Sequence, residues 1–316
     1  MTDSDILERI PNMSALVAGD LCLDCRCTYD ESGGEDRIAV TDSEFRPGLG
    51  GSVAADLAAL GCGRVAVLGV AGQDGHGFEL QNALRERGIS SENLIRTQEI
   101  PTWTSMRFIN PRTGSEDRPR IEFTPDKRLP DTLARQIVNR YQSVFDGFNL
   151  VYIADHATSE HGVVTEPFRK LIDDLSPAYP DKVVIVESKA NLPHYRRVII
   201  KPDRREAEAL SMQMLGRIDY PALREKLRAR LLVLVHEGQG VSVYDSRGAV
   251  NIPSEPYPTN SSSYSEGAFG AAFGLAFVIT RDVIRATQFG NLVAAITAAK
   301  RIEGIARPHE ILHNAR

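Results

Sequence analysis

The 316-residue sequence predicts an α/β fold with a mostly parallel sheet that helices cover on both faces. Short apolar segments rich in Val and Ile alternate with amphipathic segments of helical length. Such alternation is typical of parallel sheets, and the chain is long enough for one large core. The content of 42% hydrophobic and 25% charged residues is ordinary for a globular protein.

The hydrophobic pattern places each element in turn. Strands are expected at 15–22, 64–70, 150–154, 183–186, 198–200 and 231–235, with a hairpin partner at 241–244. Helices are expected at 52–60, 77–87, 133–144, 164–175, 204–212, 221–230, 267–279 and 283–302. Two stretches, 24–47 and 100–124, instead show short polar–apolar alternation, which predicts a small exposed sheet. We therefore expect a single domain over 1–316 with this small sheet inserted in its core.

Charge and composition exclude several classes of protein. The 37 Lys and Arg residues against 42 Asp and Glu give a formal charge of −5, which argues against nucleic acid as the main partner. The first twelve residues lack the features of a secretory signal, and the apolar stretch 268–279 is too short to span a bilayer. We expect a cytoplasmic protein without membrane contact. Cys22, Cys25 and Cys27 are expected to pack in the core, since no second Cys/His pair completes a metal site.

Residues 261–278 pass from a polar stretch through small residues into an apolar run of helical character. This layout suits a helix N-terminus that binds an anion, because unpaired N–H groups and the helix dipole converge there.

Four segments together resemble the PfkB (ribokinase-like) sugar kinases. They are Ala18-Gly19-Asp20-Leu21-Cys22-Leu23-Asp24, Arg46-Pro47-Gly48 followed by residues 53–61, residues 67–77, and Glu266-Gly267-Ala268-Phe269-Gly270. Within that family the chain is most similar to the heptose-phosphate kinase domain of the bacterial ADP-heptose synthesis enzyme. The resemblance implies a three-layer α/β/α ribokinase-like core with a small β-sheet lid. It also implies Mg-ATP as the cofactor, a sugar or sugar phosphate as the acceptor, and a homodimer formed through the lid.

The resemblance also implies a substrate site. Asp24 matches the family's Asp that holds sugar hydroxyls, although a polar residue at a strand end is the alternative. Gly48 retains a glycine of the acceptor loop, whereas Leu49 and Ser52 fall where the family has Gly and Asn. Asp155 matches an Asp that ends a central strand at the cleft. These changes predict an acceptor different from the usual phosphosugar.

Nucleotide contacts follow from two further segments. Lys201-Pro202-Asp203-Arg204-Arg205-Glu206 resembles T-P-N-x-x-E, in which the Glu organises Mg²⁺; the alternative is a helix N-cap with Asp203 and Glu206 as a capping box. The loop with His236, Gly238 and Gly240 resembles the nucleotide loop. Asn291 either faces the adenine pocket or is a buried amide satisfied by backbone.

The catalytic motif itself is altered. The family's T-G-A-G-D places its anion hole on Gly267, Ala268, Phe269 and Gly270, so the general-base Asp falls on Gly270. Glu266 is a weak surrogate, expected in the loop before the helix. Loss of a general base costs roughly 10²–10⁴ in rate. We therefore expect a catalytically impaired kinase homologue that acts as a ligand-binding or regulatory protein. One alternative is an active ATP-dependent carbohydrate kinase with rearranged catalytic groups. Another is a structural partner that assembles through its lid.

Overall fold

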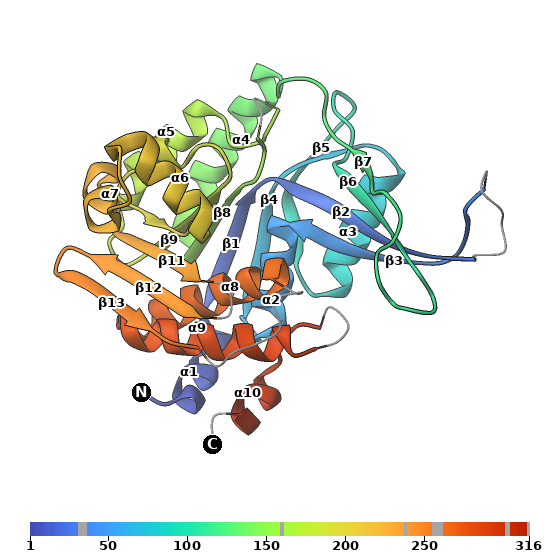
Figure 1. Cartoon of the computed structure of the whole chain (residues 1–316). Helices are drawn as coiled ribbons and strands as arrows, with labels where there is room; N and C mark the ends of the chain where they lie inside the picture. The colour runs from blue at the N-terminus through green and yellow to red at the C-terminus, as the bar shows by residue number, and fades with distance from the viewer. Residues whose placement is uncertain (31–36, 159–160, 237–238, 255–261, 301–303, 315–316) are drawn as a thin grey trace.

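The computed structural model describes the chain except residues 31–36, 159–160, 237–238, 255–261, 301–303 and 315–316 (Figure 1). The large sheet consists of β1 (Ser14–Gly19), β4 (Arg64–Gly72), β5 (Ser90–Thr97), β8 (Leu150–Asp155), β9 (Val183–Ser188), β10 (Ile199–Ile200), β11 (Leu231–His236), β12 (Gly240–Asp245) and β13 (Gly248–Ile252). Its order is β13-β12-β11-β10-β9-β8-β1-β4-β5. The pairs from β11 to β5 are parallel, whereas β12 and β13 are antiparallel. The mostly parallel α/β fold is thus confirmed.

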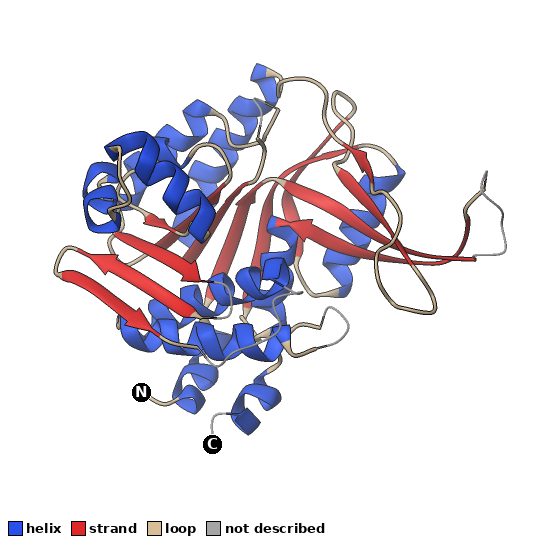
Figure 2. Cartoon of the chain, in the orientation of Figure 1, coloured by secondary structure: helices blue, strands red, loops and turns tan. Residues whose placement is uncertain are grey.

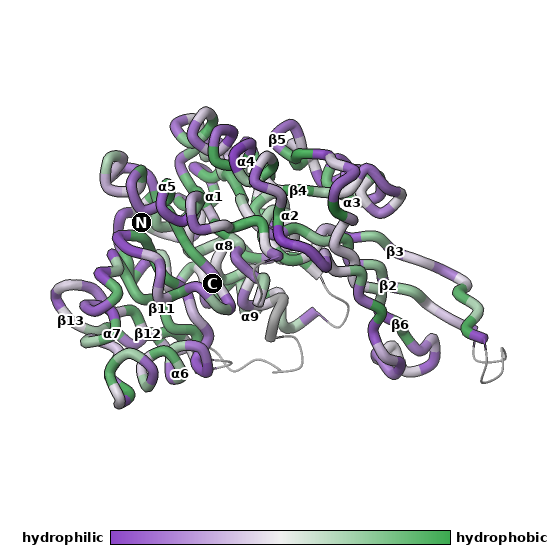
Figure 3. The backbone as a smooth tube through the Cα atoms, turned by 90° about the horizontal axis from the view of Figure 1, so that it is seen from above, coloured by the Kyte–Doolittle hydropathy of each residue, from purple (hydrophilic) through white to green (hydrophobic). Residues whose placement is uncertain are grey.

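Helices cover both faces of this sheet, because consecutive side chains of a buried strand point to opposite sides. In β1, Ala15 and Val17 belong to one core cluster, while Leu16 and Ala18 belong to the other. The first face carries α1 (Asp3–Arg9), α2 (Gly50–Ala59), α3 (Gly75–Glu86), α8 (Ser262–Thr280), α9 (Val283–Ala298) and α10 (Pro308–Asn314). The second face carries α4 (Asp131–Val144), α5 (Glu166–Leu175), α6 (Arg204–Leu215) and α7 (Tyr220–Leu227). The central strands run between these layers as hydrophobic segments (Figure 3).

A second, four-stranded sheet projects from the core as the predicted lid (Figure 2). It consists of β2 (Leu21–Asp30), β3 (Ala39–Leu49), β6 (Thr104–Ile109) and β7 (Ile121–Phe123), in the order β3-β2-β6-β7. The β2–β6 pair is parallel and the outer pairs are antiparallel. The two irregular stretches of the sequence therefore form one small sheet, as expected from their alternation.

Several boundaries differ from the prediction. The strand expected at 15–22 is two strands, because the chain turns at Gly19, where φ is +129° and a Cβ atom would lie 2.2 Å from the Ala154 carbonyl oxygen. Strands β5 and β13 were not predicted. Helix α8 begins at Ser262, five residues before the predicted start, and α9 ends at Ala298. Among the described residues, no helix is long and apolar enough to cross a membrane.

Candidate functional site

A cavity of about 470 Å³ lies between the lid and the core. It brings together six positions predicted from the sequence, namely Asp24, Gly48, Leu49, Ser52, Glu266 and Gly267. The sequence pattern did not single out every residue that lines this cavity. The basic side chains that it missed are Arg107, Arg120, His156 and Lys189. Carboxylates and several basic side chains thus line one cavity.

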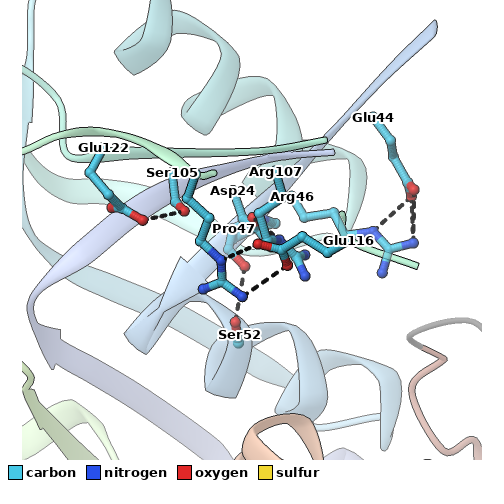
Figure 4. Close-up of polar contacts among 10 residues, drawn as sticks. Asp24, Glu44, Arg46, Pro47, Ser52, Ser105, Arg107, Glu116 and Glu122 are labelled. Carbon is cyan, nitrogen blue, oxygen red and sulfur yellow. Dashed lines mark hydrogen bonds and ion pairs between the residues drawn. The ribbon is translucent and has the colours of Figure 1, made fainter. Parts of the chain in front are cut away.

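Asp24 and Arg107 form the central contact of the lid side (Figure 4). The guanidinium donates from Nε to Oδ1 at 2.9 Å and from Nη2 to Oδ2 at 2.6 Å, with both side chains largely buried. Asp24 lies opposite Ser105 in the parallel β2–β6 pair, so Arg107 is its diagonal neighbour on the same face. Two-point charge-assisted pairing of this kind fixes the planes of the guanidinium and the carboxylate relative to each other.

Just before α2, Leu49 has a backbone conformation that glycine favours. Leu49, which caps α2, has φ of 52° and ψ of −125°. This positive φ costs a non-glycine residue about 1–3 kcal/mol. At Gly48 a Cβ atom would lie 2.5 Å from Cys22 Sγ, so the close approach of β2 and β3 requires glycine. Ser52 donates to the Pro47 carbonyl at 3.2 Å and does not replace the family's amide.

The expected anion hole is not at a helix N-terminus. Because α8 begins at Ser262, residues 267–270 lie within the helix, where N–H groups bond to carbonyls one turn back. Ala268 and Phe269 are buried, and the Phe269 ring packs in the core with its centroid 5.7 Å from that of Phe273. Glu266 lies on the helix and not in the preceding loop. The prediction of a free N–H cradle at these positions is therefore wrong.

Gly270 is enclosed by two side chains. A Cβ atom at this position would lie 2.7 Å from Tyr152 Oη and 3.2 Å from Lys201 Cε. Tyr152 donates its hydroxyl hydrogen to Glu187, and Lys201 Nζ lies 3.2 Å from the same carboxylate. The space beside Gly270 is thus occupied by a buried group of Tyr152, Glu187 and Lys201.

Electrostatic shifts follow from this burial. Burial favours the protonated form of Glu187, but Lys201, His156 and the Tyr152 hydroxyl together lower its pKa to about 2. Burial opposes the charged form of Lys201, yet Glu187 and Glu266 raise its pKa above the ordinary value. Burial raises the pKa of Glu266, and Glu187 adds to the rise. Glu187 and Lys201 form a charged pair, whereas Glu266 favours its neutral form more than an exposed Glu does.

Asp155 does not join this cavity. It ends β8 as expected, but its carboxylate accepts from Ser188 Oγ at 2.8 Å, Tyr195 Oη at 2.8 Å and Asn191 Nδ2 at 3.3 Å. It lines a different cavity, on the α5 side of the sheet. The placement of Asp155 with Asp24 in one substrate site is therefore wrong, because neighbouring side chains bind its carboxylate away from the lid.

Asp203 and Glu206 form the capping box that was the alternative to metal binding. Asp203 accepts from the Glu206 N–H at 2.8 Å, and Glu206 accepts from the Asp203 N–H at 2.8 Å. Lys189 Nζ also lies 2.5 Å from Glu206 and 3.7 Å from Asp203. An Mg²⁺ ion at Glu206 would have to displace this ammonium group. Within the described part of the chain, no group of three His, Cys, Asp or Glu residues is arranged to hold a metal ion.

The other nucleotide-loop residues make contacts within the protein. His236 pairs with Ser242 Oγ at 2.6 Å, and burial together with Arg204 lowers its pKa, which favours the neutral ring. Asn291 donates to the Ile252 and Pro253 carbonyls, each at 3.3 Å, so its amide is satisfied by backbone. Gly240 has φ of +111° beside Ile252, which suits only glycine. Gly238 lies outside the described residues.

Comparisons with known proteins agree with this architecture. The chain is 26% identical to the bifunctional protein HldE of Geobacter sulfurreducens and 27% identical to that of Geobacter metallireducens, over 95% of its length in each case. It spans 62% of each of these relatives. Among solved structures, Escherichia coli phosphofructokinase-2 in complex with potassium matches with a TM-score of 0.75 at 16% identity, covering 96% of this chain and 98% of that one.

Arabidopsis thaliana ribokinase complexed with ribose and ATP matches with a TM-score of 0.70 at 16% identity, covering 96% of this chain and 99% of that one. These two structures show the ribokinase-like fold. A sequence profile of the pfkB family of carbohydrate kinases matches residues 13–308. The chain therefore belongs to the pfkB carbohydrate kinase family.

Proposed function

We propose that this protein binds a carbohydrate or its phosphate ester in the cavity between lid and core, and that it transfers phosphate very slowly or not at all. The observation that carries this proposal is the enclosure of Gly270, where Tyr152 and Lys201 leave no room for the family's carboxylate. A regulatory or ligand-sensing homologue of a sugar kinase fits this combination of an intact cavity and a closed base position.

The cavity itself supports a polyhydroxylated ligand. The Asp24 carboxylate, Ser105 and Glu122 provide acceptors and a hydroxyl on the lid side, with Ser105 Oγ donating to Glu122 at 2.7 Å. Arg107 and Lys189 add positive charge that suits a phosphate group on the sugar. The backbone strain at Leu49 lies in the cavity wall, and strain of this kind is concentrated at ligand sites.

Calorimetric titration of the protein with a panel of sugars and sugar phosphates tests the proposal. We expect saturable binding to at least one member of the panel. The affinity should be at least about tenfold weaker in Arg107→Gln. It should be unchanged in Arg135→Gln, because Arg135 is an exposed residue of α4 outside the cavity. The same ligand with Mg-ATP should yield ADP no faster than a protein-free control. Turnover of many ADP per protein molecule, abolished by Arg107→Gln, contradicts the proposed impairment. Failure of every ligand to bind contradicts the proposed binding function.

One observation favours a second candidate, an active kinase with Glu266 as base. Glu266 lines the cavity and lies one helical turn before Gly270, so the two positions share a face of α8. Its raised pKa also suits a proton acceptor at neutral pH. Under this alternative Glu266→Gln abolishes turnover while sugar binding persists. Under the main proposal it changes only the binding of the ligand.

We also propose that the protein forms a homodimer through its lid. Val40, Ile121 and Phe123 are exposed on lid strands, and β7 is an edge strand of the small sheet. An unpaired edge with apolar side chains is suited to association with a second sheet. Light scattering after size-exclusion chromatography should give a dimer mass, and Ile121→Glu should give a monomer. A monomeric parent protein contradicts this part of the proposal.

A further inference from the structure

A second cavity, of about 590 Å³, lies along α2 and borders the lid–core cavity at Ser52. Its wall consists of the β3–α2 corner, α2, the end of α3 and residues of the C-terminal segment. Four basic side chains line it: Arg46, Arg87, Lys300 and Arg307. Its size is that of sites which hold metabolite-sized ligands.

Two of the four cations already have carboxylate partners. Arg46 pairs with Glu44 at 2.8 Å (Figure 4), and Lys300 pairs with Glu310 at 2.8 Å. Arg87 differs, because its half-buried guanidinium has a single hydrogen bond among the described residues, to the Ala83 carbonyl at 2.9 Å. It has no ion pair with any described carboxylate. Burial and the neighbouring Arg46 lower the pKa of Arg87, which reflects the cost of holding two cations close together.

One buried hydroxyl in the same wall also lacks a partner. Thr297 is 5% exposed, and its hydroxyl has no hydrogen-bond partner among the described residues. Asp56, which also lines the cavity, is 6% exposed. Burial raises the pKa of Asp56 well above its ordinary value, which favours the carboxylic acid with an O–H to donate. Buried polar groups in folded proteins are normally paired, so the Thr297 hydroxyl together with the Arg87 guanidinium indicates a missing acceptor in this cavity.

We propose that this cavity is a second binding site, for a small anion that carries phosphate or carboxylate groups. The Arg87 guanidinium, with Arg46 beside it, binds the anionic group, and the Thr297 hydroxyl donates a further hydrogen bond. Phosphate and carboxylate share the geometry that a guanidinium fork recognises, and their oxygens accept the donors that the wall leaves unpaired. The site is independent of sugar binding between lid and core, although Ser52 lines both cavities.

Isothermal titration of the full-length protein with pyrophosphate and with citrate tests this site and distinguishes the two chemistries. We expect saturable binding of at least one probe at constant ionic strength. The affinity should be about tenfold or more weaker in Arg87→Gln, because a hydrogen bond between a charged group and the probe changes affinity by about this factor. Arg85→Gln is the matched control, because Arg85 lies in the last turn of α3, two residues before the C-cap Arg87, is exposed and does not line the cavity.

Thr297→Val provides a second variant whose two effects have opposite signs. Removal of an unpaired buried hydroxyl should raise the melting temperature of the ligand-free protein, yet weaken probe binding severalfold. If Arg87→Gln fails to fold, this variant decides the result. Absence of saturable binding overturns the proposal. Probe binding that is unchanged in both variants also overturns the proposal. Probe binding that is lost only in Arg107→Gln overturns it as well, and assigns the probe to the lid–core cavity.

Discussion

Lys201 occupies the space next to Gly270, since a Cβ atom on Gly270 would lie only 3.2 Å from Lys201 Cε. The same atom would lie 2.7 Å from Tyr152 Oη, closer than real Cβ atoms approach. An added side chain at position 270 would therefore require Tyr152 or Lys201 to shift. Under the proposed function, the absence of a carboxylate at Gly270 and the close approach of these two side chains have the same consequence.

Gly270→Asp should therefore destabilise the protein and leave sugar phosphorylation at background. We expect a loss of about 1–3 kcal/mol in the free energy of unfolding from overpacking alone, measured by urea denaturation. Gly75→Asp is the control, since a Cβ atom there meets nothing within 4 Å. A stable Gly270→Asp protein with substantial kinase activity contradicts the closed-site interpretation.

Glu187 should make stability fall at acid pH. Its pKa of about 2 in the folded protein lies below the ordinary value of 4.5, so its contribution is complete above about pH 4.5 and is lost as the pH falls towards 2. The shift corresponds to about 3 kcal/mol. Glu187→Gln should lose this pH dependence, as measured by denaturation at several pH values.

The Glu187–Lys201 pair also predicts a non-additive double variant. Glu187→Gln alone leaves a buried ammonium group without its carboxylate, which costs about 3–5 kcal/mol. Lys201→Met in the Glu187→Gln background removes that charge and should restore most of the loss. Additive losses in the double-mutant cycle would show that the two groups do not interact.

Glu266→Gln should raise the melting temperature at pH 8 more than at pH 4. Burial raises the folded-state pKa of Glu266, so the carboxylate penalty is absent at low pH and grows as the pH rises above the unfolded value. A stabilised protein that binds its sugar less well would mark Glu266 as a group kept for function. An unchanged or lower melting temperature at pH 8 contradicts the assigned burial cost.

Leu49→Gly and Leu49→Ala form a matched pair that isolates backbone strain. Both remove the leucine side chain from the cavity wall, but only glycine adopts a φ of 52° without strain. The glycine variant should be more stable than the alanine variant by about 1 kcal/mol, measured by thermal or urea unfolding. Equal stabilities would show that the Leu49 backbone is unstrained.

Much of the architecture could be predicted because it depends on local patterns. The periodicity of apolar residues determined the parallel strands and most helices, and the alternation in two stretches determined the lid. The early start of α8 could not be predicted, because Ser262 to Ser265 are polar and carry no helix signal of their own. The edge strands β5 and β13 were also missed, since edge strands have only partly buried faces.

For the site, the sequence by itself determined which positions differ from the family, above all Gly270. Only the tertiary structure decided which side chains surround these positions. Sheet pairing and burial bring together residues from separate strands or the loops that follow them, namely Arg107, Tyr152, Glu187 and Lys201. It also separated Asp155 from Asp24 and turned Asp203 and Glu206 into a helix cap. Residue identity is local, but hydrogen-bond partners and free space depend on segments far apart in the chain.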